Sequence, residues 1–107
     1  MPDRLVQDFP LFALDLVALP TEVVPLHVFE ERYKAMMADC LDDDSEFGIV
    51  WAAPDGLRDV GCAMEITRVL EHHDDGRMNL LTEGTRPFRI IELGAELPYP
   101  TATVEFL

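Results

Sequence analysis

The chain has 107 residues, of which 49% are hydrophobic and 27% charged, a composition that fits one folded domain with one core and excludes a disordered chain. Its 21 acidic residues against 8 basic ones give a net charge of −13, so no broad basic face can neutralise phosphates, and nucleic acid is not expected as a partner. No apolar run approaches the roughly 20 residues of a membrane span, and the N-terminus lacks a signal peptide, so we expect a cytoplasmic protein with no membrane partner.

Prolines and glycines divide the chain into short pieces, which is typical of a β-rich fold with many turns. Residues Phe9 to Leu14 predict a short apolar strand, and Pro10 places its start there or puts the strand at a sheet edge, because proline cannot donate to a ladder. Two short extended pieces, at residues 16–19 and 23–26, follow it.

One amphipathic helix is expected at about residues 28–41. Its apolar residues recur at three- and four-residue steps and therefore share one face: Phe29, Tyr33, Met36, Met37, Cys40 and Leu41. Glu30 and Glu31 in the first turn favour the helix dipole. Acidic residues also crowd the exit of the helix at 42–44, which indicates either a solvated loop or a patch for a cation or a basic partner.

The second half of the chain predicts strands at residues 46–53, 61–73, 77–83, 84–93 with an interruption near Pro87, and 101–107, and a turn at 97–100. A hairpin joins the strands at 61–73 and 77–83. A three-residue loop, Asp74 to Gly76, sets Leu80 opposite Leu70 and matches apolar with apolar. It also puts Gly76 at the left-handed position of a turn with a bulge.

The motifs of catalysis and metal binding are missing. The sequence has no glycine-rich phosphate loop, and Ser45, the only serine, has no base with a rationale near it. His72 and His73 are adjacent in a strand, so they point to opposite faces and do not easily share an ion. Cys40 and Cys62 are expected to be small buried hydrophobes, with a disulfide or a reactive thiol as the alternative. We therefore expect no catalytic residue, no cofactor and no metal.

The string Val23-Val24-Pro25-Leu26-His27-Val28-Phe29-Glu30-Glu31-Arg32-Tyr33 is the most specific motif of the chain. With the strand before it, it resembles the opening of the N-terminal domains of the Lon protease family. Residues 60–63, 75–84 and 86–90 resemble later segments of these domains in the same order, so the resemblance covers residues ~9 to 107. The signature residues are Pro25, Leu26, His27, Phe29, Glu30, Arg32, Tyr33, Gly61, Gly84, Arg86 and Phe88.

The resemblance implies a mainly β, PUA-like pseudobarrel of about six short strands with one helix packed against it. It implies a single domain over residues 1–107, either a stand-alone Lon-domain protein or the β-rich half of one. The helical subdomain, the ATPase domain and the Ser–Lys protease domain of longer members do not fit in 107 residues. It also implies a non-catalytic module that recognises unfolded or hydrophobic polypeptide segments in protein quality control and supports assembly. PUA-like folds elsewhere bind RNA, but the net charge of −13 argues against that here.

The signature is interpreted as mainly structural. Pro25 would direct the chain into the helix, Phe29 and Tyr33 would anchor the helix on the barrel, and Gly61 and Gly84 would allow bulges or close approach. His27 is expected to have a structural role, as a hydrogen-bonding residue at the helix entry. The alternative is that it acts as a metal ligand or a general base.

Binding of unfolded chains needs exposed apolar surface. The candidate residues for it are Met36, Met37, Met64 and Met78, which are adaptable side chains, together with Trp51. The alternative is that the methionines belong to the core. An exposed edge strand, at residues 9–14 or 101–107, could instead capture an extended peptide or pair with another copy.

Two other functions stay open. One is an assembly or regulatory element without a substrate of its own. The other is a small-molecule-binding or enzymatic cleft in the pseudobarrel, using His27, His72 or His73 with nearby carboxylates.

Overall fold

The structure is a computed structural model that describes residues 5–94 and 98–107. These residues form a sheet of six strands and one helix, in the order β1 (Leu5–Leu14), β2 (Val23–Val28), α1 (Glu31–Asp43), β3 (Phe47–Ala53), β4 (Gly56–His72), β5 (Met78–Gly94) and β6 (Thr101–Phe106). The predicted mainly β class with a single helix is confirmed for the described part of the chain.

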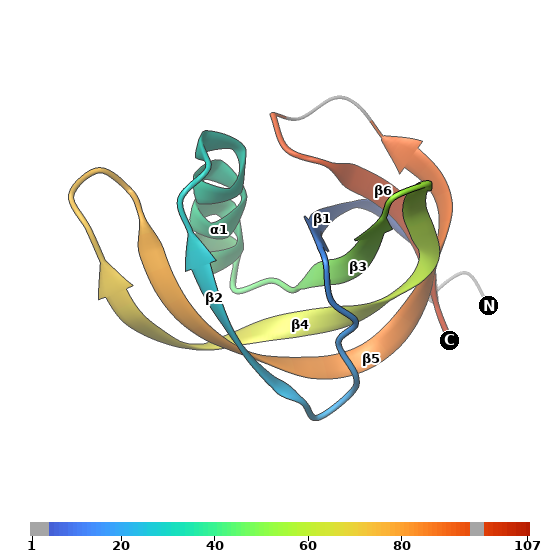
Figure 1. Cartoon of the computed structure of the whole chain (residues 1–107), viewed down its shortest axis with the longest axis horizontal. Helices are drawn as coiled ribbons and strands as arrows, with labels where there is room; N and C mark the ends of the chain where they lie inside the picture. The colour runs from blue at the N-terminus through green and yellow to red at the C-terminus, as the bar shows by residue number, and fades with distance from the viewer. Residues whose placement is uncertain (1–4, 95–97) are drawn as a thin grey trace.

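The sheet closes into a barrel (Figure 1). β1 pairs with β3 in parallel and with β6 in antiparallel orientation, and antiparallel pairs join β3 to β4, β4 to β5 and β5 to β6. β2 stays outside this ring and pairs with β5 alone. Closure gives each strand of the ring two neighbouring strands, although the second half of β4, Glu65 to His72, pairs with β5 alone, and β2 has one neighbour along its whole length.

β5 pairs with three other strands, β2, β4 and β6. β4 lies along one of its edges, while the other edge is divided: its first half, Met78 to Glu83, pairs with β2, and its second half, Phe88 to Gly94, pairs with β6. The strands predicted at 77–83 and 84–93 are therefore one strand. Pro87 costs the sheet little, because it lies between the segment that pairs with β2 and the segment that pairs with β6.

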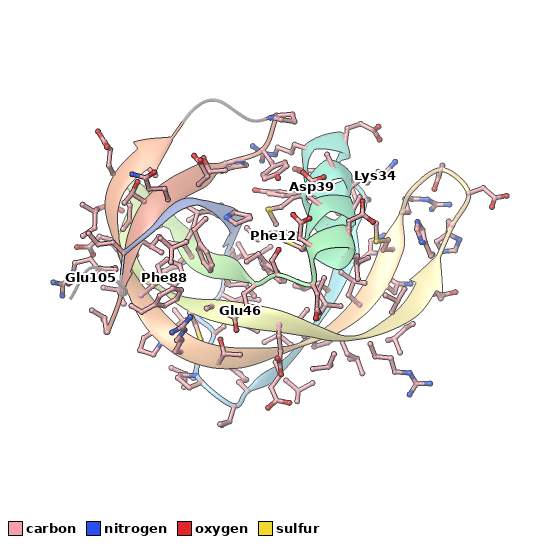
Figure 2. The ribbon with its side chains drawn as sticks, turned by 180° about the vertical axis from the view of Figure 1, so that it is seen from behind. Phe12, Lys34, Asp39, Glu46, Phe88 and Glu105 are labelled. Atoms are coloured by element: carbon pink, nitrogen blue, oxygen red, sulfur yellow. The ribbon has the colours of Figure 1, made fainter. Side chains whose placement is uncertain are left out.

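Two glycines, Gly48 and Gly61, make room for an aromatic ring inside the barrel. The Phe88 ring is fully buried and occupies the space where a Cβ on Gly48 or Gly61 would stand, at 2.5 and 2.7 Å (Figure 2). Phe9 meets Phe88 and Phe106 edge to face, with ring centroids 5.5 and 5.6 Å apart. This packing forms one end of the core, and a second cluster forms the other end beneath α1.

The helix begins later than the sequence predicted. Val28 still pairs with Met78 in the β2–β5 ladder, and Glu30 is the extended residue that precedes the first helical turn. Phe29 therefore lies outside the helix, is 58% exposed and does not anchor it, so that prediction was wrong. Tyr33 does anchor it, together with Met36, Met37 and Cys40 on the buried face.

The β4–β5 hairpin has the predicted three-residue loop. The His73 N–H donates to the Arg77 carbonyl at 2.8 Å, and Gly76 has φ +93. Leu80 pairs with Val69 and not with Leu70, because a bulge between Val69 and Glu71 shifts the register by one residue.

Lys34 connects α1 to the tip of this hairpin. Its Nζ donates to the carbonyl of Asp75 at 2.8 Å and to the Glu31 carboxylate at 2.6 Å (Figure 2). The exit of the helix has its left-handed residue at Asp44, whose N–H donates to the Cys40 carbonyl. One smaller expectation changed, because residues 16–19 form no strand. Of the predicted turn at 97–100, residues 98–100 lie within the described residues, and the chain bends there without forming a strand.

Gly84 holds the connection between β1 and β2 against β5. Its N–H donates to the Glu22 carbonyl and its own carbonyl accepts from the Thr21 N–H, at 2.9 and 2.8 Å. A Cβ at this position would lie 2.1 Å from the carbonyl oxygen of Leu19, a backbone atom that cannot turn away.

We therefore expect Gly84→Ala to lower the free energy of unfolding by about 2 kcal/mol or more, measured by chemical denaturation. The matched control is Glu92→Ala, an exposed residue of the same strand, which should change stability by less than about 0.5 kcal/mol. Equal effects of the two substitutions would contradict the close approach at Gly84.

Candidate functional site

A groove lies between the end of β1, the strand β2 and the start of α1. Its volume is about 320 Å³. Most of the residues that line it are apolar or aromatic: Phe12, Ala13, Leu14, Leu16, Pro25, Leu26, His27, Phe29, Glu30, Arg32 and Tyr33. Hollows of this kind, apolar with few polar groups, are the usual form of a binding site.

The floor of the groove is an aromatic stack. Phe12 and Tyr33 are both 4% exposed, and their rings lie 4.1 Å apart between centroids and 9° from parallel. The Tyr33 hydroxyl accepts the N–H of Ala13 at 3.4 Å. The Arg32 guanidinium lies 4.6 Å from the centre of the Tyr33 ring, and its Nε is 3.3 Å from a Glu30 carboxylate oxygen. These contacts join α1 to β1 and give the groove a rigid base.

Phe29 forms the rim. It is 58% exposed, and its ring is stacked on that of His27 with centroids 5.5 Å apart. His27 is in turn held from the sheet: its Nδ1 lies 2.6 Å from Oδ1 of Asn79, while the Asn79 amide donates to the Glu71 carboxylate. Because Oδ1 of an amide only accepts, Nδ1 of His27 carries the proton in this arrangement. The hydrogen bond to Asn79 thus fixes the orientation of the His27 imidazole, and the Phe29 ring stacks on that imidazole.

The residues of the Lon-like string come together here. Seven of them line the groove: Pro25, Leu26, His27, Phe29, Glu30, Arg32 and Tyr33. The four later signature residues lie elsewhere. Gly61, Gly84 and Phe88 take part in the close packing described above, and Arg86 lies over the Phe106 ring with its guanidinium 3.7 Å from the ring centre.

The methionines predicted as a surface for peptides are in the core. Met36, Met37 and Met64 are 0% exposed and Met78 is 2% exposed, so their side chains pack under the helix and do not meet solvent. Trp51 is 37% exposed on β3, where the Arg58 guanidinium lies 4.9 Å from its ring centre, and it does not line the groove. These five residues do not form one site.

Sequence reasoning missed the exposed apolar residues that lie between β1 and β2 and at the start of β2. Leu16, Val17, Leu19 and Val23 are 37%, 62%, 61% and 57% exposed. The available signal was their apolar character in a stretch interrupted by prolines, which does not fit an ordinary polar loop. Together with Phe29 they make the surroundings of the groove apolar.

The edge strands predicted for peptide capture or self-association are also different. The two predicted segments lie in β1 and β6, which belong to the ring. β6 pairs with β1 and β5, whereas β1 pairs with β6 over Leu5 to Pro10 and with β3 over Leu11 to Leu14. Among the strands described, β2 is the one that pairs along a single edge.

A second hollow, of about 420 Å³, lies near the other end of α1 and is acidic. Asp39 on the helix and Glu46 after it belong to its lining (Figure 2). The Tyr99 hydroxyl donates to Asp39 at 2.6 Å, and burial together with that carboxylate raises the pKa of Tyr99. Glu46 faces the Arg86 guanidinium at 4.0 Å. Two carboxylates of this hollow, those of Asp39 and Glu46, therefore already face a partner within it.

The described residues contain no group of three His, Cys, Asp or Glu side chains arranged to hold a metal ion. The histidines do not converge either: His27 lies in the groove, and His72 and His73 lie where β4 ends. The single helix among the described residues is neither long nor apolar enough to cross a bilayer.

The comparisons with known proteins agree on one family. The family model described as the ATP-dependent protease La (LON) substrate-binding domain matches residues 8–107. A relative, Lon protease 2 from Myxococcus xanthus, is 30% identical over 112 aligned positions, which cover 96% of this chain and 13% of that protein.

Two solved structures have the same fold. The Lon N-terminal domain protein from Xanthomonas campestris superposes with a TM-score of 0.81 at 28% identity, covering 94% of this chain and 60% of that one. The N-terminal domain of the Mycobacterium avium complex Lon protease gives a TM-score of 0.65 at 20% identity, with 94% and 53% covered. The chain thus spans a small part of the full protease and somewhat more than half of each solved domain.

Both cysteines are free and buried, and we expect them to be unreactive in the folded protein. Burial raises the pKa of the Cys40 thiol to about 11, and it also raises the pKa of Cys62. A thiol reagent at mild alkaline pH should therefore modify the native chain far more slowly than the denatured chain.

The same shift predicts a loss of stability at high pH. The thiol form is favoured by folding, so the stabilisation is complete below the pKa of an unfolded cysteine, about 8.5, and falls as pH rises through the folded value. In the labelling experiment, modification of the native cysteines at a rate close to that of the denatured chain would contradict their buried placement.

Proposed function

We propose, from the premise that this chain belongs to the family of substrate-binding domains of the ATP-dependent protease La (LON), that it is a non-catalytic module that binds unfolded or hydrophobic polypeptide segments. The groove between β1, β2 and α1 is the site that we assign to this binding. Catalysis in such a protease belongs to other domains, and the matched family is its substrate-binding part.

The observation that carries the proposal is the exposed Phe29 on the rim of an apolar groove. A phenylalanine that stays 58% exposed beside a hollow leaves apolar area that a partner can remove from water. Burying a whole side chain of this size contributes about 1.5 to 3 kcal/mol, and here roughly half remains available. Aromatic residues with such a position often dominate the energy of an interface.

The polar groups of the groove favour a polypeptide over a small polar ligand. His27 is hydrogen-bonded to Asn79, and Arg32 is paired with Glu30, so the charged and polar side chains already have partners. What a ligand meets first is therefore apolar surface. An unfolded segment offers apolar side chains together with an unpaired backbone, whereas a folded protein has already buried both.

The groove is small, so the affinity should be modest. A volume of about 320 Å³ is at the low end of the range for ligand pockets, which admits a few side chains. We expect dissociation constants between about 1 μM and 1 mM for short apolar peptides. Weak binding suits a module that must release a segment as easily as it takes it.

Replacing Phe29 by alanine should weaken binding of labelled apolar peptides by about five- to thirtyfold, because about 1 to 2 kcal/mol of apolar contact is lost. Fluorescence anisotropy titrations measure this directly. The matched control is Leu93→Ala, since Leu93 is 59% exposed, close to the value for Phe29, and lies at the far end of β5 outside the groove.

The control variant should bind as tightly as the unmodified chain. The proposal fails if peptides of this class give flat titrations, or if the two variants lose affinity equally. Phe29 is exposed and outside the helix, so its replacement should leave the melting temperature within a few degrees of that of the unmodified chain.

A further inference from the structure

The free edge of β2 carries backbone groups without partners in the sheet. The Gly84 N–H donates to the Glu22 carbonyl at 2.9 Å, so this carbonyl points toward β5 directly before the first pair of the β2–β5 ladder, Val23 with Glu83. In an antiparallel ladder, residues whose backbone groups point toward the partner strand alternate with residues whose backbone groups point away from it. The backbone groups of residues 24, 26 and 28 therefore point toward β5, and those of Val23, Pro25 and His27 point away from it.

Pro25 fits this alternation. Proline has no N–H, so in a strand it stands where no ladder bond is lost. The outward edge then offers the N–H groups of Val23 and His27 and the carbonyls of Val23, Pro25 and His27. Two donors and three acceptors are enough to pair with several residues of an added strand.

This edge faces the groove. Pro25, Leu26 and His27 line it, whereas no residue of β5 does. The opposite wall is the end of β1, where the Ala13 N–H has the Tyr33 hydroxyl 3.4 Å away, a long hydrogen bond. Between the two strands lies the Phe12–Tyr33 stack. An extended chain laid along β2 would therefore place alternate side chains on this aromatic floor.

The segment that frames the groove is acidic. Residues 12–34 contain four carboxylates, on Asp15, Glu22, Glu30 and Glu31, against the two cations of Arg32 and Lys34. The whole chain has a net charge of −13. A field of this sign attracts cationic segments and repels a second copy of the same chain, which has the same charge.

We propose that the occupant of the groove is an extended polypeptide segment with an apolar centre flanked by lysine or arginine, which adds to the sheet as a strand along the free edge of β2. This inference rests on the proposed function and gives it a geometry and a charge preference. The backbone bonds require no particular sequence, the aromatic floor takes the apolar centre, and the flanking cations meet the surrounding carboxylates.

Three peptides of equal length test the inference by anisotropy titration. The first has five apolar residues between two lysines on each side, the second has glutamates in place of the lysines, and the third is the lysine peptide N-methylated at alternate residues, prepared in both phases. Methylation removes backbone donors and blocks strand pairing on one edge while keeping the side chains.

We expect the lysine peptide to bind at least about tenfold more tightly than the glutamate peptide at an ionic strength of about 0.05 M, with the difference shrinking at about 0.5 M. One methylation phase should weaken binding by about tenfold or more, because several backbone bonds are lost together.

Variants of His27 test the edge from the side of the protein. His27→Pro removes the outward N–H and the imidazole, while His27→Ala removes the imidazole alone, so the proline variant should bind about three- to tenfold more weakly than the alanine variant. The N–H of this residue has no partner in β5, so proline should not break the ladder; melting curves check that both variants fold.

Charge variants give the second comparison. The pair Glu30→Gln with Glu31→Gln should reduce the preference for lysine over glutamate peptides. The matched control is Asp43→Asn with Asp44→Asn, an equal change of charge at the other end of the helix, about 18 Å away at 1.5 Å per residue and beyond the Debye length of about 8 Å. The control should preserve the preference.

The outcomes separate the two proposals. Equal binding of methylated and unmethylated peptides overturns strand addition, and equal binding of lysine and glutamate peptides overturns the charge preference; in both cases the groove would still be a binding site for apolar segments. Loss of the preference in the Asp43 and Asp44 variant would place the cations in the acidic hollow instead. If no peptide of the set binds, the proposed function itself fails.

Discussion

The division of one edge of β5 between two strands is the constraint on which the rest of the molecule depends. β4 occupies the other edge, so β2 and β6 must share what remains, β2 on the first half and β6 on the second. β6 then turns to β1 and closes the ring, and β2 is left with a single neighbour. Phe88, packed over Gly48 and Gly61, fills the curved end of the barrel where this closure occurs. The free edge beside the groove is thus a consequence of how the barrel closes.

The same segment of chain serves both folding and the groove because its residues alternate. Val24, Leu26 and Val28 point into the core, whereas Pro25 and His27 between them are exposed and line the groove. Tyr33 serves both purposes, because its ring packs in the core and also forms the floor of the groove with Phe12. A short string of sequence can therefore be characteristic of a family for two physical reasons, core packing and the lining of a groove. Substitution at a single position does not separate these two reasons.

The local features of the fold were predictable from the sequence, and the features that depend on closure were not. The alternation of β4 and the loop of the hairpin follow from neighbouring residues, yet the bulge at Leu70 that shifts Leu80 to Val69 does not. Phe29 was assigned to the helix because it precedes Tyr33 by four residues, but the ladder to Met78 keeps β2 extended as far as Val28. Likewise, a methionine in a helix or a strand has the same pattern in the sequence whether its face meets solvent or the core. Here Met36 and Met37 on α1, Met64 on β4 and Met78 on β5 all meet the core.

An open edge beside an apolar groove is ordinarily a hazard, since identical edges pair with each other and aggregate. Three features of this chain reduce that hazard without closing the edge. Pro25 removes one donor from it, the exposed length is a strand of six residues, and every copy has a net charge of −13. Pairing between two copies must overcome the repulsion between their negative charges, whereas a cationic segment is attracted by the same charge. The strong acidity from which we expect no nucleic-acid partner therefore also distinguishes a cationic foreign chain from a second copy at the same edge.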